Sequence, residues 1–303
     1  MPVPYERGCQ MSSAGELASG KGHRDENFPV ASGLISPRHR AIVLAFYRFA
    51  RVADDVADHA SLAPAEKLAL LDRMEETLLG RSDAEADALP LRAALAERGM
   101  SARHPLDLLK AFRLDVTKLR YRDWDDLMDY CRYSASPVGR FVLDVHGESE
   151  STWPANDALC SALQVINHLQ DCAKDYHNLN RVYIPLDIFA AAGLAPEVLA
   201  QAEAPPALLA GIRQLNARTN DLLRISSVFS RRIADLRLAL EVAVIQRLAL
   251  TLTGMLATRD PLSDNVHLGK AGFVGVGALG MAQGLALRLL RLAGARPAPG
   301  EAA

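Results

Sequence analysis

The sequence predicts an all-α fold, arranged as one helical bundle. Apolar residues recur at intervals of three and four along most of the chain, which is the spacing of a helix face. The alternation of apolar and polar residues that is typical of a half-buried strand is not convincing anywhere. The breaks between the periodic segments are too short and too apolar for interdomain linkers. We therefore expect a single domain.

Each predicted helix lies between clusters of turn residues. The first follows Ser36-Pro37, the second follows Ala63-Pro64, and residues 147–154 precede the fifth. Residues 185–206 and Asp260-Pro261 mark the later breaks. The helical period is found in these segments: 38–59, 64–79, 106–119, 124–145, 156–178, 207–227 and 234–257.

The two ends of the chain are expected to lie outside the bundle. Residues 1–25 are rich in glycine, serine and charge, lack the apolar core of a secretory signal, and are expected to be a disordered arm. Residues 26–293 form the domain, and residues 294–303 form a tail.

One apolar segment near the end of the chain is a membrane candidate. Residues 271–287 carry no charge for 17 residues between Lys270 and Arg288, but they contain five glycines and Gln283. The segment is short for a bilayer span. We interpret it as a buried terminal helix, with contact at a bilayer surface as the alternative.

Charge and cysteine usage exclude several classes of protein. A net charge of −2 and a pI near 6.5 provide no basic field for nucleic acid. The four cysteines form no C-x-x-C pair, which argues against a zinc site and against a disulfide framework. A reducing, cytoplasmic compartment is predicted.

Two acidic motifs lie inside otherwise apolar helices. They are DDVAD at residues 54–58 and DCAKD at residues 171–175. Aspartates four residues apart share a helix face at roughly 6 Å between Cβ atoms. Their repulsion there is about 3 kcal/mol at an effective dielectric near 20. A cation is therefore expected between them.

The oxygen-bearing residues around the second motif indicate which cation it is. Gln164, Asn167, Asp171 and Asp175 follow one another along a single face. Mg²⁺ selects carboxylate and amide oxygens and leaves positions for phosphate oxygens and water. No EF-hand loop and no P-loop is present. For the first motif taken alone, a solvated helix face is the alternative.

Four motifs in order resemble the squalene/phytoene synthase family. They are RVADDVAD at 51–58, YCRYSASPVG at 130–139, QVINHLQDCAKD at 164–175 and RVYIP at 181–185. Two further stretches, ENFPVAS at 26–32 and QDCAKDY at 170–176, are most similar to the bacterial branch that makes hydroxysqualene in hopanoid pathways. In many relatives a pair such as His-Ser stands in place of Glu26-Asn27.

The resemblance implies a class I isoprenoid synthase bundle with a central apolar cavity. It implies a Mg²⁺-dependent, diphosphate-releasing carbon–oxygen lyase that binds several ions. The implied substrate is presqualene diphosphate, with water capturing the carbocation and no nicotinamide cofactor. Other hopanoid-pathway enzymes and the inner membrane face are the implied contacts.

The resemblance also implies roles for individual residues. The implied metal ligands are Asp54, Asp58, Asp171, Asp175 and Asn167. The implied substrate contacts are Asn27, Arg51, Gln164, Asn167, Lys174 and Arg181. The implied catalytic residues are Tyr130, Arg51 and Tyr183.

Several residues keep a structural alternative. Arg51 forms an ion pair with Asp54 or Asp55 if it does not contact diphosphate, and Lys174 and Arg181 share that ambiguity. The two tyrosines are core aromatics with bonded hydroxyls in the alternative interpretation, and Asn27 is a cap or turn residue. His168 points away from the aspartates and is interpreted as a packing or surface residue.

Other functions are open at this point. A presqualene diphosphate or phytoene-type synthase would use the same metal motifs to couple two prenyl diphosphates. A head-to-tail prenyltransferase or terpene cyclase would share the acidic motif without the segments at 130–139 and 164–183. A non-enzymatic helical assembly factor would carry the motifs as relics, although the intact aspartates count against that.

Overall fold

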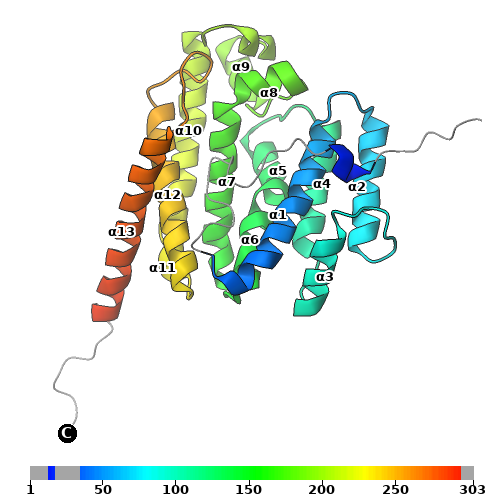
Figure 1. The fold of residues 1–303 in the computed structure, drawn as a ribbon. Helices are drawn as coiled ribbons and strands as arrows, with labels where there is room; N and C mark the ends of the chain where they lie inside the picture. The colour runs from blue at the N-terminus through cyan, green and yellow to red at the C-terminus, as the bar shows by residue number, and fades with distance from the viewer. Residues whose placement is uncertain (1–12, 18–34, 295–303) are drawn as a thin grey trace, which may run out of the picture.

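The computed structural model describes residues 13–17 and 35–294, and the regular structure of this part is helical. Figure 1 shows the helices running roughly side by side as a bundle. In the first half of the chain the α-helices are α1 (Pro37–Asp58), α2 (Pro64–Leu78), α3 (Leu89–Arg98), α4 (Arg103–Thr117), α5 (Trp124–Ser134) and α6 (Ser136–His146). The second half contains α7 (Trp153–Gln170), α8 (Cys172–Leu179), α9 (Leu186–Ala192), α10 (Pro206–Ser226), α11 (Phe229–Arg232), α12 (Leu236–Leu256) and α13 (Lys270–Gly294). Three short 3-10 helices, η1 (Ala14–Leu17), η2 (Glu150–Thr152) and η3 (Pro196–Ala200), complete the set.

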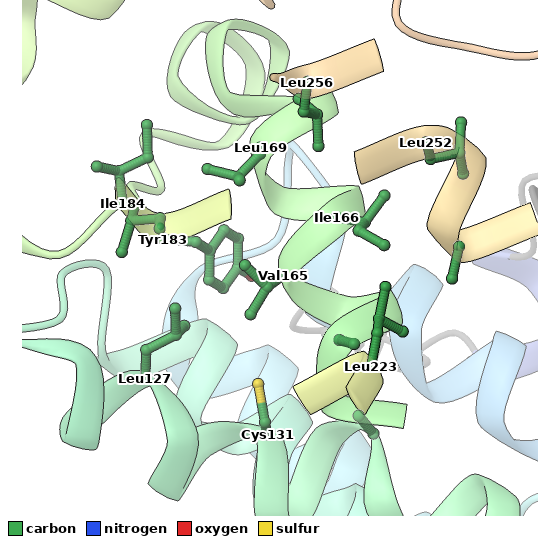
Figure 2. Packing of buried hydrophobic residues seen from close by; sticks show 14 of the residues in the cluster. Leu127, Cys131, Val165, Ile166, Leu169, Tyr183, Ile184, Leu223, Leu252 and Leu256 are labelled. Atoms are coloured by element: carbon green, nitrogen blue, oxygen red, sulfur yellow. The ribbon is translucent and has the colours of Figure 1, made fainter. Parts of the chain in front are cut away.

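Helix α7 lies at the centre of the bundle, with α10 and α12 on one side and α5 and α6 on the other (Figure 1). Its side chains belong to the larger of two apolar clusters. Figure 2 shows Ile166 of α7 near Leu223 of α10 and Leu252 of α12, with Val165 on the side of Tyr183. The second acidic motif therefore begins at the end of the most deeply packed helix.

A second apolar cluster joins α1 to α2, α3, α4 and α6. At its centre the rings of Phe46 and Phe141 stack with their centroids 3.9 Å apart. The buried face of α1 includes Val52 and Val56, which alternate with the acidic residues at the helix end. This packing fixes the rotation of α1, and with it the direction of the first motif.

Two segments predicted as single helices are each interrupted by one residue. Residues 124–145 divide into α5 and α6 at Ala135, just before Pro137, which occupies the first turn of α6 where its missing N–H costs nothing. Residues 156–178 divide into α7 and α8 at Asp171, whose φ of −101° and ψ of 10° leave the helical region. The break changes the direction in which the second motif presents its aspartates.

Short helices also occur where none was predicted. Helix α3 and helix α9 have ten and seven residues, too few turns for a reliable period. Within the expected N-terminal arm, Ala14–Leu17 forms η1, and the buried Ala14 donates its backbone N–H to Glu85 at 2.9 Å. The other residues of that arm lie outside the described part of the chain.

The apolar terminal segment forms α13, but the expectation that it is buried is wrong. By length and composition, both α12 and residues 270–289 could cross a membrane. In α12, however, 56% of the most apolar stretch is buried inside the bundle, whereas in α13 only 11% of the corresponding stretch is buried. Helix α13 packs along α12 on the outside of the bundle (Figure 1). The composition of the segment shows that it is apolar, but composition does not show which helix lies inside the bundle.

Candidate active site

The candidate site lies where the C-terminal ends of α1, α4 and α8 meet. The chain leaving α8 pairs with the chain leaving α4 through one parallel bridge between Arg120 and Val182. The backbone N–H of Val182 donates to the carbonyl of Leu119 at 3.0 Å. This pairing delivers Arg181 to the end of α1.

Arg181 is a buried cation that joins three elements. Its Nη1 lies 2.5 Å from Oδ1 of Asp58, and its Nη2 donates to the carbonyl of Ala57 at 3.2 Å. Its Nε donates to the carbonyl of Asp115 at 3.0 Å. Burial opposes the charge, but Tyr183, Asp115 and Asp58 outweigh it and raise the pKa of Arg181. Arg181 therefore carries a permanent positive charge between the two acidic motifs.

The aspartates of the first motif are paired with arginines but differ in exposure. Arg51 lies 3.2 Å from Asp54 and 3.0 Å from Asp55, so both ion pairs of the structural alternative are present. Asp55 is buried, whereas the side chain of Asp54 is 36% exposed. Burial, followed by the charge of Asp58, raises the pKa of Asp54 well above its usual value. Asp54 and Asp58 therefore lie close enough for their charges to repel, although each is paired with an arginine.

The second motif bends at its first aspartate. Asp171 ends α7, and its carbonyl accepts the backbone N–H of Asp175 at 2.8 Å. Burial and the neighbouring Asp171 raise the pKa of Asp175 to about 7, and the charge of Asp58 adds to this effect. Lys174 is largely exposed, with its Nζ 4.0 Å from Asp171. His267, which the sequence analysis did not select, lies 3.9 Å from Asp171.

The charges of the two acidic motifs indicate whether the site fits a divalent cation. Asp58 of the first motif raises the pKa of Asp175 of the second, so both motifs contribute to one electrostatic site. Carboxylates whose pKa is raised by one another are stabilised by a cation. In residues 13–17 and 35–294, however, no three His, Cys, Asp or Glu side chains are grouped as a metal site. The donor set fits Mg²⁺ if phosphate oxygens and water complete the coordination.

A buried aspartate that the sequence analysis did not select lies behind Arg181. Asp115 accepts the hydroxyl of Tyr130 at 2.9 and 3.0 Å and the hydroxyl of Tyr183 at 2.9 Å. Burial raises the pKa of Asp115 to about 6, although Arg181 and the tyrosine hydroxyls oppose the shift. The two tyrosines are therefore brought together, with both hydroxyls bonded to one carboxyl group.

Gln164 and Asn167 are half-buried on α7, in the two turns before Asp171. Gln164 places its amide nitrogen 3.2 Å from Nε2 of His168. The His168 ring stacks on Tyr183 with centroids 3.6 Å apart, and burial lowers its pKa to about 3. His168 is thus a buried packing residue that is neutral near pH 7.

One predicted contact is not placed by the structure, and one cavity lies apart from this cluster. Asn27 lies outside the described residues. A cavity of about 220 Å³ lies between α10, α12 and α13 and contains none of the predicted site residues. Its lining includes Ser226, Gln246 and Leu250.

Known proteins resemble this chain over most of its length. A family model described as squalene/phytoene synthase matches residues 22–271. A hydroxysqualene synthase from Rhodopseudomonas palustris is 59% identical over 264 residues, which are 87% of this chain and 90% of the relative. Another from Sinorhizobium fredii is 55% identical over 271 residues, covering 89% of this chain and 93% of the relative. The crystal structure of a squalene synthase from Alicyclobacillus acidocaldarius superposes with a TM-score of 0.65 at 26% identity, covering 90% of this chain and 93% of that one.

Proposed function

Because this chain belongs to the squalene/phytoene synthase family, whose members process prenyl-type diphosphates, we propose that it converts presqualene diphosphate and water to hydroxysqualene and diphosphate. The observation that carries the proposal is the 59% identity, over 87% of this chain, to a hydroxysqualene synthase. The meeting of both acidic motifs around Arg181 supports it.

The aspartates would hold the metal. Asp54 and Asp58 on α1 and Asp171 and Asp175 at the α7–α8 junction are the proposed Mg²⁺ ligands, with Asn167 as a further ligand or diphosphate contact. Several bound Mg²⁺ ions would supply Lewis acidity and a template for the leaving diphosphate. The raised pKa values of Asp54 and Asp175 support this assignment because both carboxyls require a counter-charge to ionise fully.

Basic and polar side chains would hold the substrate. Arg181 is buried and permanently charged, which suits an anion beside the metal ligands. Arg51 lies next to Asp54, and the exposed Lys174 lies next to Asp171. In the complex, diphosphate oxygens would replace these aspartates as the partners of the two cations. Gln164 and Asn27 complete the proposed contacts.

The chemistry requires a carbon–oxygen bond to break and a new one to form. Diphosphate departs with the bonding electrons, the cyclopropylcarbinyl cation rearranges with ring opening, and water adds to the cation and then loses a proton. Tyr130 and Tyr183 are the proposed catalytic residues beside the cation, with Arg51 acting on the diphosphate. The hydroxyls of Tyr130 and Tyr183 donate to Asp115, which would hold both tyrosines in place beside the cation. No nicotinamide is required because water, rather than hydride, terminates the reaction.

The proposed location is the cytoplasm, at the inner face of the membrane, in contact with other hopanoid-pathway enzymes. The described cysteines Cys131, Cys160 and Cys172 are free thiols, which suits a reducing compartment. Substrate and product are both long hydrocarbons, and this supports work close to a bilayer.

The test is a product analysis. The purified protein is incubated with Mg²⁺ and either presqualene diphosphate or farnesyl diphosphate, without nicotinamide, and the extracts are analysed by gas chromatography and mass spectrometry. A C30 alcohol from presqualene diphosphate is the expected result. Conversion of farnesyl diphosphate would show instead a synthase that couples two prenyl diphosphates, and no product from either would contradict catalysis of this kind.

A further inference from the structure

The outward face of α13 is apolar over its described length. The exposed large side chains are Val274 (69%), Leu279 (59%), Leu285 (41%) and Leu289 (65%). At 100° per residue they span an arc of about 140° of the helix circumference. Between them the outward positions are alanine or glycine, with Gln283 at the edge. A helix at the surface of a bundle normally turns charged side chains outward. An apolar outward face therefore indicates a surface that binds another molecule.

The opposite face of α13 is fixed to the bundle. A Cβ on Gly280 would lie 2.9 Å from the Val244 backbone, and one on Gly284 would lie 2.8 Å from the Ala243 side chain. The two helices therefore touch closely through small residues. Near the other end, Arg288 donates to the backbone carbonyls of Ile233 at 3.0 Å and Ala234 at 2.6 Å. Because this flank is held along α12, the helix presents its apolar face sideways and does not cross a bilayer as an independent span.

The charges around the face have one sign. Lys270 begins the helix, Arg288 lies towards its end, and the sequence of α13 contains no aspartate or glutamate. Arg247, which is exposed on α12, lies beside Gly280 on the flank where α13 meets α12. An apolar surface with basic residues around it is complementary to acyl chains beneath anionic headgroups.

We propose that α13 docks the enzyme sideways on an anionic lipid bilayer, with Val274, Leu279, Leu285 and Leu289 entering the boundary between headgroups and acyl chains. Lys270 and Arg247 contact the headgroups. The proposal makes the proposed membrane location more specific. Docking would let the enzyme take a hydrocarbon substrate from the bilayer and return the product to it, and only this purpose rests on the proposed function.

A second copy of the chain fits this face less well. In a parallel pair of α13 helices Lys270 would lie near its own copy, and in an antiparallel pair it would lie near Arg288 of the other copy. Neither arrangement has an acidic residue of α13 to neutralise the charges, and like charges placed together oppose association. Anionic headgroups neutralise both ends at once.

The experiment measures cosedimentation of the full-length protein with sucrose-loaded vesicles. One set of vesicles contains phosphatidylglycerol and phosphatidylcholine, and the other contains phosphatidylcholine alone. We expect binding to the anionic vesicles that weakens with added salt. The variant Leu279→Ser should bind about tenfold more weakly, and Lys270→Gln about fivefold more weakly. The matched control is Ile225→Ser, since Ile225 on α10 is 55% exposed and lies outside this face.

Three results would overturn the docking proposal: no binding to either vesicle, equal binding by Leu279→Ser and wild type, or equal loss in Ile225→Ser. A wild-type dimer that becomes monomeric in Leu279→Ser, as measured by sedimentation equilibrium, would assign the face to a second copy instead. Turnover of detergent-dispersed presqualene diphosphate is measured separately. Absent turnover with intact vesicle binding would count against the proposed function and leave the docking surface standing.

Discussion

The guanidinium of Arg181 lies 2.5 Å from the carboxylate of Asp58, and the two residues are 123 positions apart in the chain. This ion pair ties the end of α1 to the segment that follows α8. The charge of Asp58 in turn helps to raise the pKa of both Asp54 and Asp175. In the absence of metal, Arg181 therefore provides part of the positive charge that the acidic motifs require.

Replacing Arg181 by glutamine should destabilise the fold. The change leaves Asp115, which is buried, without its neighbouring cation and removes bonds to two backbone carbonyls. Breaking a buried charge pair from one side costs about 3 kcal/mol. Urea unfolding followed by circular dichroism measures the loss. In the control Arg122→Gln a largely exposed cation is lost while Asp126 keeps its shorter pair with Lys118, so this variant should unfold like wild type. An equally stable Arg181→Gln would contradict the role of Arg181 as an internal counter-charge.

The single variants Asp54→Ala and Asp171→Ala should abolish turnover without unfolding the protein. Each removes a proposed metal ligand, but each also removes repulsion within a cluster of carboxylates, so the two effects on stability offset one another. Product formation from presqualene diphosphate and the urea midpoint are the two measurements. Asp129→Ala, which removes an exposed pair with Arg132, is the control and should retain activity. Full activity in either of the first two variants would defeat the metal assignment.

The fold class and both acidic motifs could be predicted from sequence because each depends on local spacing. The period of α1 and α7 is visible in the chain itself, and Asp54 and Asp58 share a face by helix geometry alone. The break at Asp171 could not be predicted in the same way, since the residues on both sides keep a helical period.

Contacts between segments that are distant in the chain could not be predicted from local spacing. Asp115 appeared in the sequence as one acid in an amphipathic helix, and its bonds to Tyr130 and Tyr183 exist only because α4, α5 and the segment after α8 converge. An aspartate in the last turn of an amphipathic helix was the only sign of it in the sequence. The exposure of α13 is a similar case, because apolarity does not state which side of a helix is covered.

Gly139 should be intolerant of alanine because α6 touches α7 there. A Cβ at this position would lie 1.9 Å from Oδ1 of Asn156 and 2.8 Å from Sγ of Cys160. Asn156 is buried in the first turn of α7, and its amide donates to the Ser136 carbonyl and to Asp157. Relief therefore requires the Asn156 side chain to give up these bonds or α7 to shift, at a cost of roughly 1–3 kcal/mol. Gly254→Ala in α12 is the matched control, since nothing lies within 4 Å of its Cβ position, and alanine there should stabilise the helix by up to about 1 kcal/mol. Thermal melting of both variants decides, and a Gly139→Ala protein as stable as wild type would show that the two helices can separate without cost.

The stability contribution of Asp115 should depend on pH in a stated direction. Its pKa is raised from 3.8 to about 6 by burial, so between these values the folded protein holds a proton that the unfolded chain has released. Stability from this group is complete below pH 4 and is lost as pH rises to about 6, by up to roughly 3 kcal/mol. In the variant Asp115→Asn the side chain does not titrate, and the hydroxyls of Tyr130 and Tyr183 can still donate to its amide oxygen. The unfolding free energy of this variant relative to wild type should therefore rise from pH 4 to pH 6, as measured by urea titrations at each pH. A difference that stays constant over this range would show that Asp115 is ionised throughout, and a difference of opposite slope would show that Arg181 and the tyrosine hydroxyls outweigh burial.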